Sequence, residues 1–286
     1  MRLLPTVLLP VGAAMALTAA TPASPRSFGA AVQAQETNTR DAFTWSGAIP
    51  AGRWIRVWNL NGSVIVEPTT GDKVQVTAIE RWRRGDTSMV HFTVQKVGPG
   101  GDDVLFCALW GDRSDCDERG YHSHQDSDDN ERGNRNNDVN VQFRVLVPRG
   151  IRVAMNTVNG SVHVSGATSE VRAGSINGEV DVATSGGPVN ASSVNGSVRA
   201  RIGQVNPGDE MSFTSVNGSL ITEWPSDLNA DVDIATLNGS IRPDFEMTVS
   251  GRIEPRRVNA HIGKPGGAHL RFRTVNGSVE IRKGGG

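Results

Sequence analysis

One short motif occurs seven times in the chain: an apolar residue, Asn-Gly, in most copies Ser, and then another apolar residue. The Asn-Gly pairs are Asn61-Gly62, Asn159-Gly160, Asn177-Gly178, Asn195-Gly196, Asn217-Gly218, Asn238-Gly239 and Asn276-Gly277. Asn259, followed by Ala260, marks an eighth, degenerate copy. From Asn159 onward the spacings are 18, 18, 22, 21, 21 and 17 residues. A period of this size predicts a repeat architecture.

Apolar residues flank each Asn at fixed offsets of minus six, minus four, minus one, plus three and plus five. Around Asn159 these residues are Val153, Met155, Val158, Val162 and Val164. The offsets alternate as strands require, but the Asn-Gly pair changes the parity. Each unit is therefore predicted to form two short strands joined at a corner. We expect the corner glycine to adopt a positive φ, which costs glycine little.

Two all-β folds satisfy this pattern. In a β-solenoid, similar to a parallel β-helix, each unit of about 20 residues stacks on the preceding one and Asn-Gly forms the repeated corner. In an antiparallel β-meander or sandwich, each Asn-Gly closes a two-residue hairpin. We favour the solenoid because Ser or Thr recurs two residues before the Asn and Ser two residues after it. Stacked coils would place such side chains in hydrogen-bonded ladders.

The first 34 residues are predicted to be a signal peptide, because Arg2 precedes an apolar run and Val32-Gln33-Ala34 resembles a cleavage site. Residues 35–148 form an N-terminal β region with the first repeat and an acidic loop at about 111–137, which we expect to be disordered. Residues 149–283 carry the remaining repeats. No later apolar stretch has the length of a membrane helix. We therefore expect export to the periplasm or to the cell surface and medium, with no transmembrane segment after cleavage.

Cys107 and Cys116 are the only cysteines. In an exported chain they predict one disulfide, with free or intermolecular thiols as the alternative. Imidazoles and carboxylates in the acidic loop could bind zinc or calcium, and they are His122, His124, Asp126, Asp128 and Asp129. A solvated acidic loop is the simpler interpretation, and Glu131 occupies the position where an EF-hand requires Gly. No metal and no cofactor are predicted.

No established catalytic motif is present: the chain lacks a nucleophile elbow, a phosphate loop, paired CxxC motifs and HExxH. Asp231, Asp233, Asp244 and Glu246 could supply an acid and a base for glycoside hydrolysis, but solvation of a strand face explains them better. Ser161 and His163 lack an orienting acid. Five tryptophans of the N-terminal part could form an aromatic core or a ligand surface, and we favour core packing; they are Trp45, Trp54, Trp58, Trp82 and Trp110. Trp224 is the only one in the later repeats. No catalytic residue is predicted.

Charge is nearly balanced, with a formal net charge of -1, and does not indicate a nucleic-acid partner. The distribution is nevertheless uneven. Residues 102–138 contain eleven acidic and four basic side chains, whereas residues 242–283 contain nine basic and four acidic ones. A basic end and an acidic insertion could meet between two copies of the chain.

The segment Ile55 to Val64 reads Ile-Arg-Val-Trp-Asn-Leu-Asn-Gly-Ser-Val, and later units repeat Val-Asn-Gly-Ser-Val. With these units, residues 50–283 resemble the bacterial putative-adhesin family, exported β-solenoid domains of unknown function. The resemblance implies a location in the cell envelope. The insertion from Cys107 to Asn137 is not part of the repeat pattern.

From these patterns we expect a non-enzymatic exported envelope or surface protein, with adhesion through a β-solenoid binding face. The partner would be a cell-surface glycan, an envelope polymer or a second copy. A self-assembling periplasmic scaffold or an envelope sensor is the alternative. A carbohydrate-active enzyme is the third hypothesis.

Overall fold

The computed structural model describes residues 37–123, 137–250 and 256–284. The predicted signal peptide lies outside the described residues, as do His124, Asp126, Asp128 and Asp129 of the acidic loop. The described chain is all-β, as predicted, with a single short 3₁₀ turn, η1 (Thr87–Met89). A membrane-spanning helix is not found among these residues.

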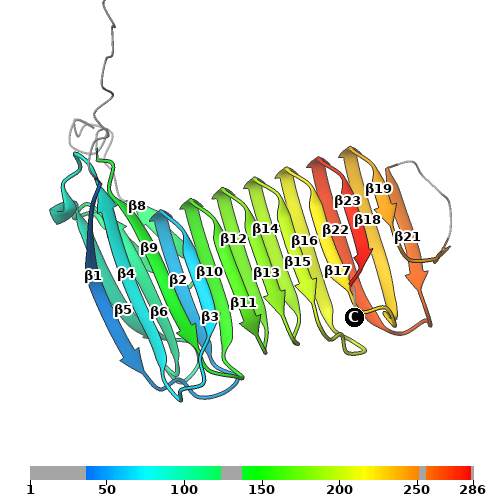
Figure 1. Cartoon of the computed structure of the whole chain (residues 1–286), viewed down its shortest axis with the longest axis horizontal. Coiled ribbons are helices and arrows are strands. Elements are labelled where there is room, and N and C mark those ends of the chain that lie inside the picture. Colours follow the sequence, from blue (N-terminus) through cyan, green and yellow to red (C-terminus); the bar gives the residue numbers. More distant parts are fainter. Residues whose placement is uncertain (1–36, 124–136, 251–255, 285–286) are drawn as a thin grey trace, which may run out of the picture. The chain divides into compact units, whose positions relative to one another are not determined.

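Two large, open, mixed sheets contain nearly all strands (Figure 1). Sheet A has the spatial order β1 (Asn38–Gly47), β4 (Val74–Trp82), β9 (Asn140–Val147), β3 (Val64–Pro68), β11 (Val162–Ala167), β13 (Val180–Thr184), β15 (Val198–Ile202), β17 (Leu220–Trp224), β23 (Val279–Lys283) and β19 (Ile241–Pro243). Sheet B has the order β20 (Met247–Val249), β21 (Arg257–Ile262), β18 (Ala230–Asn238), β22 (Ala268–Asn276), β16 (Glu210–Asn217), β14 (Val189–Asn195), β12 (Val171–Asn177), β10 (Arg152–Asn159), β2 (Trp54–Asn61), β6 (Asp103–Trp110) and β5 (Val90–Val97). A hairpin of β7 (Ser114–Asp117) and β8 (Gly120–Ser123) is separate.

Each repeat gives one strand to each sheet. In the second repeat, β10 ends at Asn159 in sheet B and β11 begins at Val162 in sheet A. Strands of adjacent repeats pair in parallel and in the same register, so that Asn159 lies beside Asn177. The Asn-Gly pairs therefore connect the two sheets and do not close two-residue hairpins.

The core lies between the two sheets. Offsets minus six, minus four, plus three and plus five point inward, and Val153, Met155, Val162 and Val164 are buried. Toward the C-terminal end, Phe213 of sheet B stacks on Phe272 and meets the edge of Trp224 from sheet A. At the N-terminal end, rings of both sheets make the core, with Trp45 against Phe106 at 5.1 Å between centroids. This apolar layer holds the sheets together.

The stacking order differs from the chain order at the last repeat. Strand β22 lies between β16 and β18 and pairs in parallel with both. Strand β23 lies in the same way between β17 and β19. The prediction that each unit stacks on the preceding one is therefore wrong here. It fails because every unit offers its neighbours the same hydrogen-bonding register. A unit inserted between two others is therefore paired as well as a unit added at the end of the stack.

The predicted eighth copy is also wrong. Asn259 lies within β21, which runs antiparallel to β18, and it faces Asp233 there. Strand β20 then pairs antiparallel with β21 and ends sheet B. Without the corner glycine, the chain at Ala260 continues as a strand.

The corner glycines are required by crowding, and the prediction of positive φ is wrong for all but one of them. Only Gly62 has a positive φ, at 125°. At Gly160, Gly178, Gly196, Gly218, Gly239 and Gly277, a Cβ atom would overlap the carbonyl oxygen of the corner glycine in the neighbouring unit. Stacking at a single strand spacing brings the backbones too close for any side chain.

Two sets of hydrogen bonds join the corners. The corner asparagines form one continuous ladder, in which each Nδ2 donates to the Oδ1 of the preceding member at 2.8–2.9 Å. Its members in spatial order are Asn61, Asn159, Asn177, Asn195, Asn217, Asn276 and Asn238. The Ser and Thr hydroxyls two residues before each Asn do not bond to one another. They donate instead to the corner-glycine carbonyl of the neighbouring unit, as Ser175 does to Gly160 at 2.7 Å.

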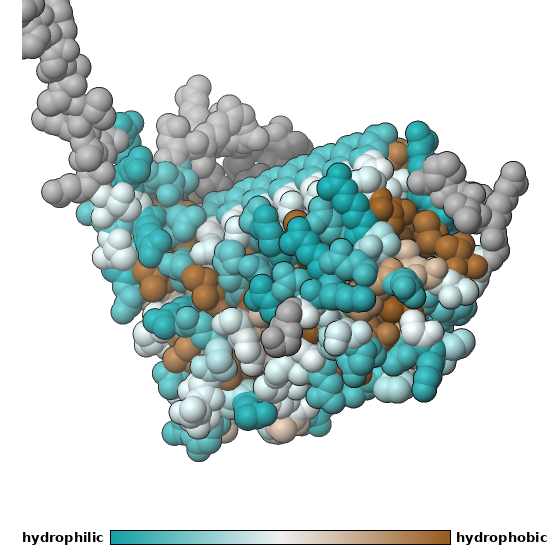
Figure 2. Space-filling view, turned by 45° about the vertical axis from the view of Figure 1, so that its right-hand side comes forward, coloured by the Kyte–Doolittle hydropathy of each residue, from teal (hydrophilic) through white to brown (hydrophobic). Residues whose placement is uncertain are grey.

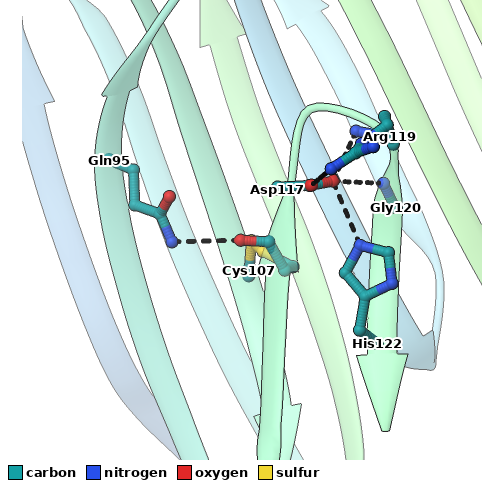
Figure 3. Close-up of a disulfide and its surroundings, with 7 residues drawn as sticks. Gln95, Cys107, Asp117, Arg119, Gly120 and His122 are labelled. Carbon is teal, nitrogen blue, oxygen red and sulfur yellow. Dashed lines mark hydrogen bonds and ion pairs between the residues drawn. A yellow bond between two sulfur atoms is a disulfide. The ribbon is translucent and has the colours of Figure 1, made fainter.

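The insertion places a disulfide on the outer face of sheet B. Cys107 of β6 and Cys116 of β7 are bonded, and they are buried with Leu105, Leu109 and the half-buried Trp58. Figure 3 shows this site, where the Gln95 amide donates to the Cys116 carbonyl at 3.2 Å. The β7–β8 hairpin thus covers part of the outer face of sheet B, which is exposed to solvent at the later repeats.

Asp117 organises the turn between β7 and β8. Its carboxylate contacts His122 and accepts hydrogen bonds from the backbone N–H groups of Arg119 and Gly120 (Figure 3). The His122 contact and these donors hold the pKa of Asp117 well below its ordinary 3.8.

Because that pKa is lowered, the turn should keep the charge of Asp117 above pH 3.8 and lose it only as the pH falls further. Carbon-13 titration of the Asp117 carboxyl should give a midpoint below 3.8. His122→Gln should move the midpoint upward. A midpoint at or above 3.8 in the unaltered protein would contradict the arrangement.

The crowded corner gives a stability prediction. Gly196→Ala puts a methyl group against the Gly178 carbonyl, and we expect a loss of about 3 kcal/mol in unfolding free energy. Gly186→Ala is the matched control, because its Cβ would meet nothing closer than 3.9 Å and its φ is not positive. Urea unfolding of both variants checks this, and equal midpoints would show that the corner is not crowded.

Candidate functional site

Parallel register aligns the outward side chains of sheet B in rows that cross the strands. The row five residues before each corner Asn contains, in spatial order, Arg56, Ala154, Arg172, Asn190, Ser212, Arg271 and Asp233. Three further outward rows lie at offsets of minus seven, minus three and minus one from the corner Asn. Side chains at the same offset in adjacent repeats therefore lie one strand spacing apart, about 4.8 Å.

The row directly before the Asn ladder is apolar and exposed. It includes Ile176, Val194, Val216, Val275 and Leu237, with exposed fractions from 37% to 51%. The sequence pattern groups these residues with the core offsets, but strand alternation places offset minus one on the outer face, as it does offsets minus five and minus three. We call this set the apolar row. Figure 2 shows that apolar residues also gather at the end of the stack that carries β19 to β21, where Ile241, Met247 and Val249 are half-buried.

A groove of about 570 Å³ lies on the outer face of sheet B toward its C-terminal end. Residues of β14, β16, β18, β21 and β22 line it, and most of them are polar. The groove contains three carboxylates, Glu210, Asp231 and Asp233, together with His261, His269 and Arg271. The inserted strand β22 contributes His269 and Arg271, so the groove depends on the unexpected stacking order.

Asp233 lies under three guanidinium groups. Arg273 donates to its Oδ2 at 2.8 Å, and Arg257 and Arg271 approach within 3.7 and 3.9 Å. The carboxylate is 26% exposed, whereas the three arginines are 46–62% exposed. The anion is therefore recessed and the cations project into solvent.

Asp231 lies between two histidines in the row seven residues before the Asn. One carboxylate oxygen contacts Nδ1 of His261, and the other lies 3.8 Å from Nδ1 of His269. Glu210 of β16 lies beside His269 of β22 in the same row. This cluster carries both donors and acceptors of hydrogen bonds.

The four predicted acid and base candidates are not brought together. Asp231 and Asp233 line the groove, but Asp244 and Glu246 do not. Asp244 follows β19 of sheet A and accepts a hydrogen bond from the Lys283 backbone at 3.4 Å. Ser161 lies at a corner, and His163 lies on the outer face of sheet A.

Within the described ranges, no group of three or more His, Cys, Asp or Glu side chains is arranged to hold a metal ion. Sequence reasoning missed His261, His269 and Arg257 as members of the site. His269 could have been found from its offset of seven before Asn276. His261 and Arg257 could not, because they belong to the antiparallel strand β21.

The chain matches no protein-family model and no curated protein. Several solved structures are similar to it, including the following two. One is a putative cell adhesion protein from Clostridium sporogenes, with a TM-score of 0.47 and 9% identity over 85% of this chain and 99% of that one. The other is a putative adhesin from Bacteroides fragilis, with a TM-score of 0.40 and 12% identity over 86% and 97%.

Proposed function

We propose that the chain is a non-enzymatic, exported envelope or surface protein of the adhesin type, in which stacked repeats form a β-solenoid. The outer face of sheet B is its binding face, and a glycan or envelope polymer is its ligand. The observation that carries this is the groove, a concave polar site that crosses five adjacent strands. A chain-like ligand would lie across the strands and contact successive side chains of one row along its length.

The contacts of the carboxylates favour binding over catalysis. Glycoside hydrolysis needs an acid and base pair whose carboxyl groups face the scissile bond. The Asp233 carboxylate instead accepts a hydrogen bond from Arg273, with Arg257 and Arg271 nearby, and the Asp231 carboxylate contacts His261 and lies near His269. Carboxylate oxygens held in this way can accept hydrogen bonds from the hydroxyl groups of a bound polymer.

A steric change in the groove tests the binding face. Ser212→Trp would fill the groove from β16, and we expect at least about a ten-fold loss of affinity for any polymer bound on a polysaccharide and envelope-polymer array. Ile221→Trp adds similar bulk at a half-buried site on the opposite sheet and should change affinity less than about two-fold. Equal binding by both variants would show that the groove is not used.

The enzymatic alternative has its own test. Polysaccharides incubated with the purified protein should show no new reducing ends, and Asp231→Asn with Asp233→Asn should change nothing. Cleavage that disappears in the double variant would replace the binding proposal by a carbohydrate-active enzyme.

The apolar row favours one second candidate, a self-assembling scaffold. A second copy is the partner that fits, because its own apolar row would have the same strand spacing. Ile176→Ser with Val216→Ser should then abolish association in sedimentation experiments at high concentration. A monomer under all conditions would remove this candidate.

A further inference from the structure

The charges on the outer face of sheet B suggest what kind of polymer would bind there, if the proposed binding function holds. Two clusters on this face have the same construction. In each, a recessed carboxylate lies among guanidinium groups that extend further into solvent than it does.

The first cluster surrounds Glu170, just before β12. Glu170 is 18% exposed, whereas Arg172 and Arg152 are 54% and 43% exposed. Arg172 donates to Glu170 at 2.9 Å, and its guanidinium lies 4.6 Å from the ring centroid of the buried Trp54. Arg152 lies 5.8 Å from the same centroid. Stacking on Trp54 fixes the direction in which these guanidinium groups point.

The second cluster is Asp233 with Arg257, Arg271 and Arg273, in the groove and at its border. One carboxylate there balances one of three positive charges. Arg271 is the most exposed of the three, at 62%.

The two clusters lie at a defined spacing along one row. Arg172 and Arg271 occupy the same offset on β12 and β22, with β14 and β16 between them. Three strand spacings of about 4.8 Å separate them by about 14 Å. Asn190 and Ser212 fill the interval, and they offer uncharged hydrogen-bonding groups.

The outer face of sheet A is built differently. Its ion pairs are mostly one-to-one, such as Arg199 with Glu179 and Arg201 with Glu223. Among the described residues of that face, only Glu280 lies beside two arginines, Arg242 and Arg282, and it is a single cluster of the recessed type. An excess of projecting cations in two spaced clusters is therefore a property of sheet B.

We infer that the outer face of sheet B binds an anionic polysaccharide that lies across the strands. Its carboxylate, sulfate or phosphate groups contact Arg172 and Arg271, about 14 Å apart. Its hydroxyl groups bond to Asn190, Ser212 and the recessed carboxylates. Nucleic acid fits less well, because its closely spaced phosphates would approach Glu170, Glu210 and Asp233.

The test compares charged polymers with their neutral counterparts. The probes are polygalacturonate with its methyl ester, dextran sulfate with dextran, and double-stranded DNA, each titrated against the full exported protein at two salt concentrations. We expect at least one charged polymer to bind about ten-fold or more tightly than its neutral counterpart and to weaken with salt. Oligomers of that polymer shorter than about 14 Å should lose most of the affinity.

Amino-acid substitutions identify the residues that contact the polymer. Arg172→Gln and Arg271→Gln should each weaken binding about ten-fold, and together by about a hundred-fold. Arg201→Gln removes the same charge from a more exposed arginine on sheet A and should have less than about a two-fold effect. Circular dichroism of each variant controls for folding.

Four results would overturn the inference. Equal binding of charged and neutral polymers, with loss in Ser212→Trp, would leave the proposed function and remove the anionic ligand. Equal losses in Arg201→Gln would indicate general charge attraction, and DNA bound as tightly as any polysaccharide would indicate a nucleic-acid partner. Absence of binding to every polymer would remove the inference and the proposed function together.

Discussion

The close approach of corner glycines is the constraint on which the described structure depends. Each corner places a backbone N–H within reach of the adjoining unit, as Gly160 N donates to the Asn177 carbonyl at 3.1 Å. No Cβ atom fits at these positions from the second repeat onward. Once adjacent units are held at this spacing, the Asn ladder and the Ser or Thr bonds to the glycine carbonyls follow. The corner thus fixes the register of both sheets.

Fixed register has a consequence at the surface. Because each offset faces the same offset in the next unit, a substitution in one repeat changes one position of a row. Most of these rows vary along the stack, and one of them places the uncharged Asn190 and Ser212 between the charged Arg172 and Arg271. The core offsets vary less, since they must fill the space between two sheets. The repeats therefore supply a constant frame on which the outer faces differ.

The sequence was sufficient to predict all-β structure, two strands in each unit and the position of every corner but one. It did not reveal that offset minus one points outward. Val216 and Val275 are as apolar as core residues, and their face is known only once the parity change is placed after the Asn. It also could not place β22 between β16 and β18, since identical motifs pair equally well in either order. What distinguishes the orders is packing, such as Phe272 stacked on Phe213, and packing is not visible in a motif.

The same insertion determines the candidate site. Asp231 and Asp233 were recognised in the sequence, but their partners His269, Arg271 and Arg273 are about forty residues away and arrive on β22. In chain-order stacking, β18 would lie beside β16, and β22 would take the place that β21 has beside β18. The groove residues of β21 and the β16–β22 contact would then be lost. The groove and the second arginine cluster therefore both depend on the position of one strand.

Distances between spin labels test that position most directly. One label replaces Leu60 on β2, and the second replaces Val275 on β22 or Leu237 on β18. With β22 inserted, the two pairs should be separated by about five and six strand spacings, or about 24 and 29 Å, so that Val275 is the nearer. If Leu237 is nearer to Leu60 than Val275 is, the repeats stack in chain order and the site described for β22 does not exist.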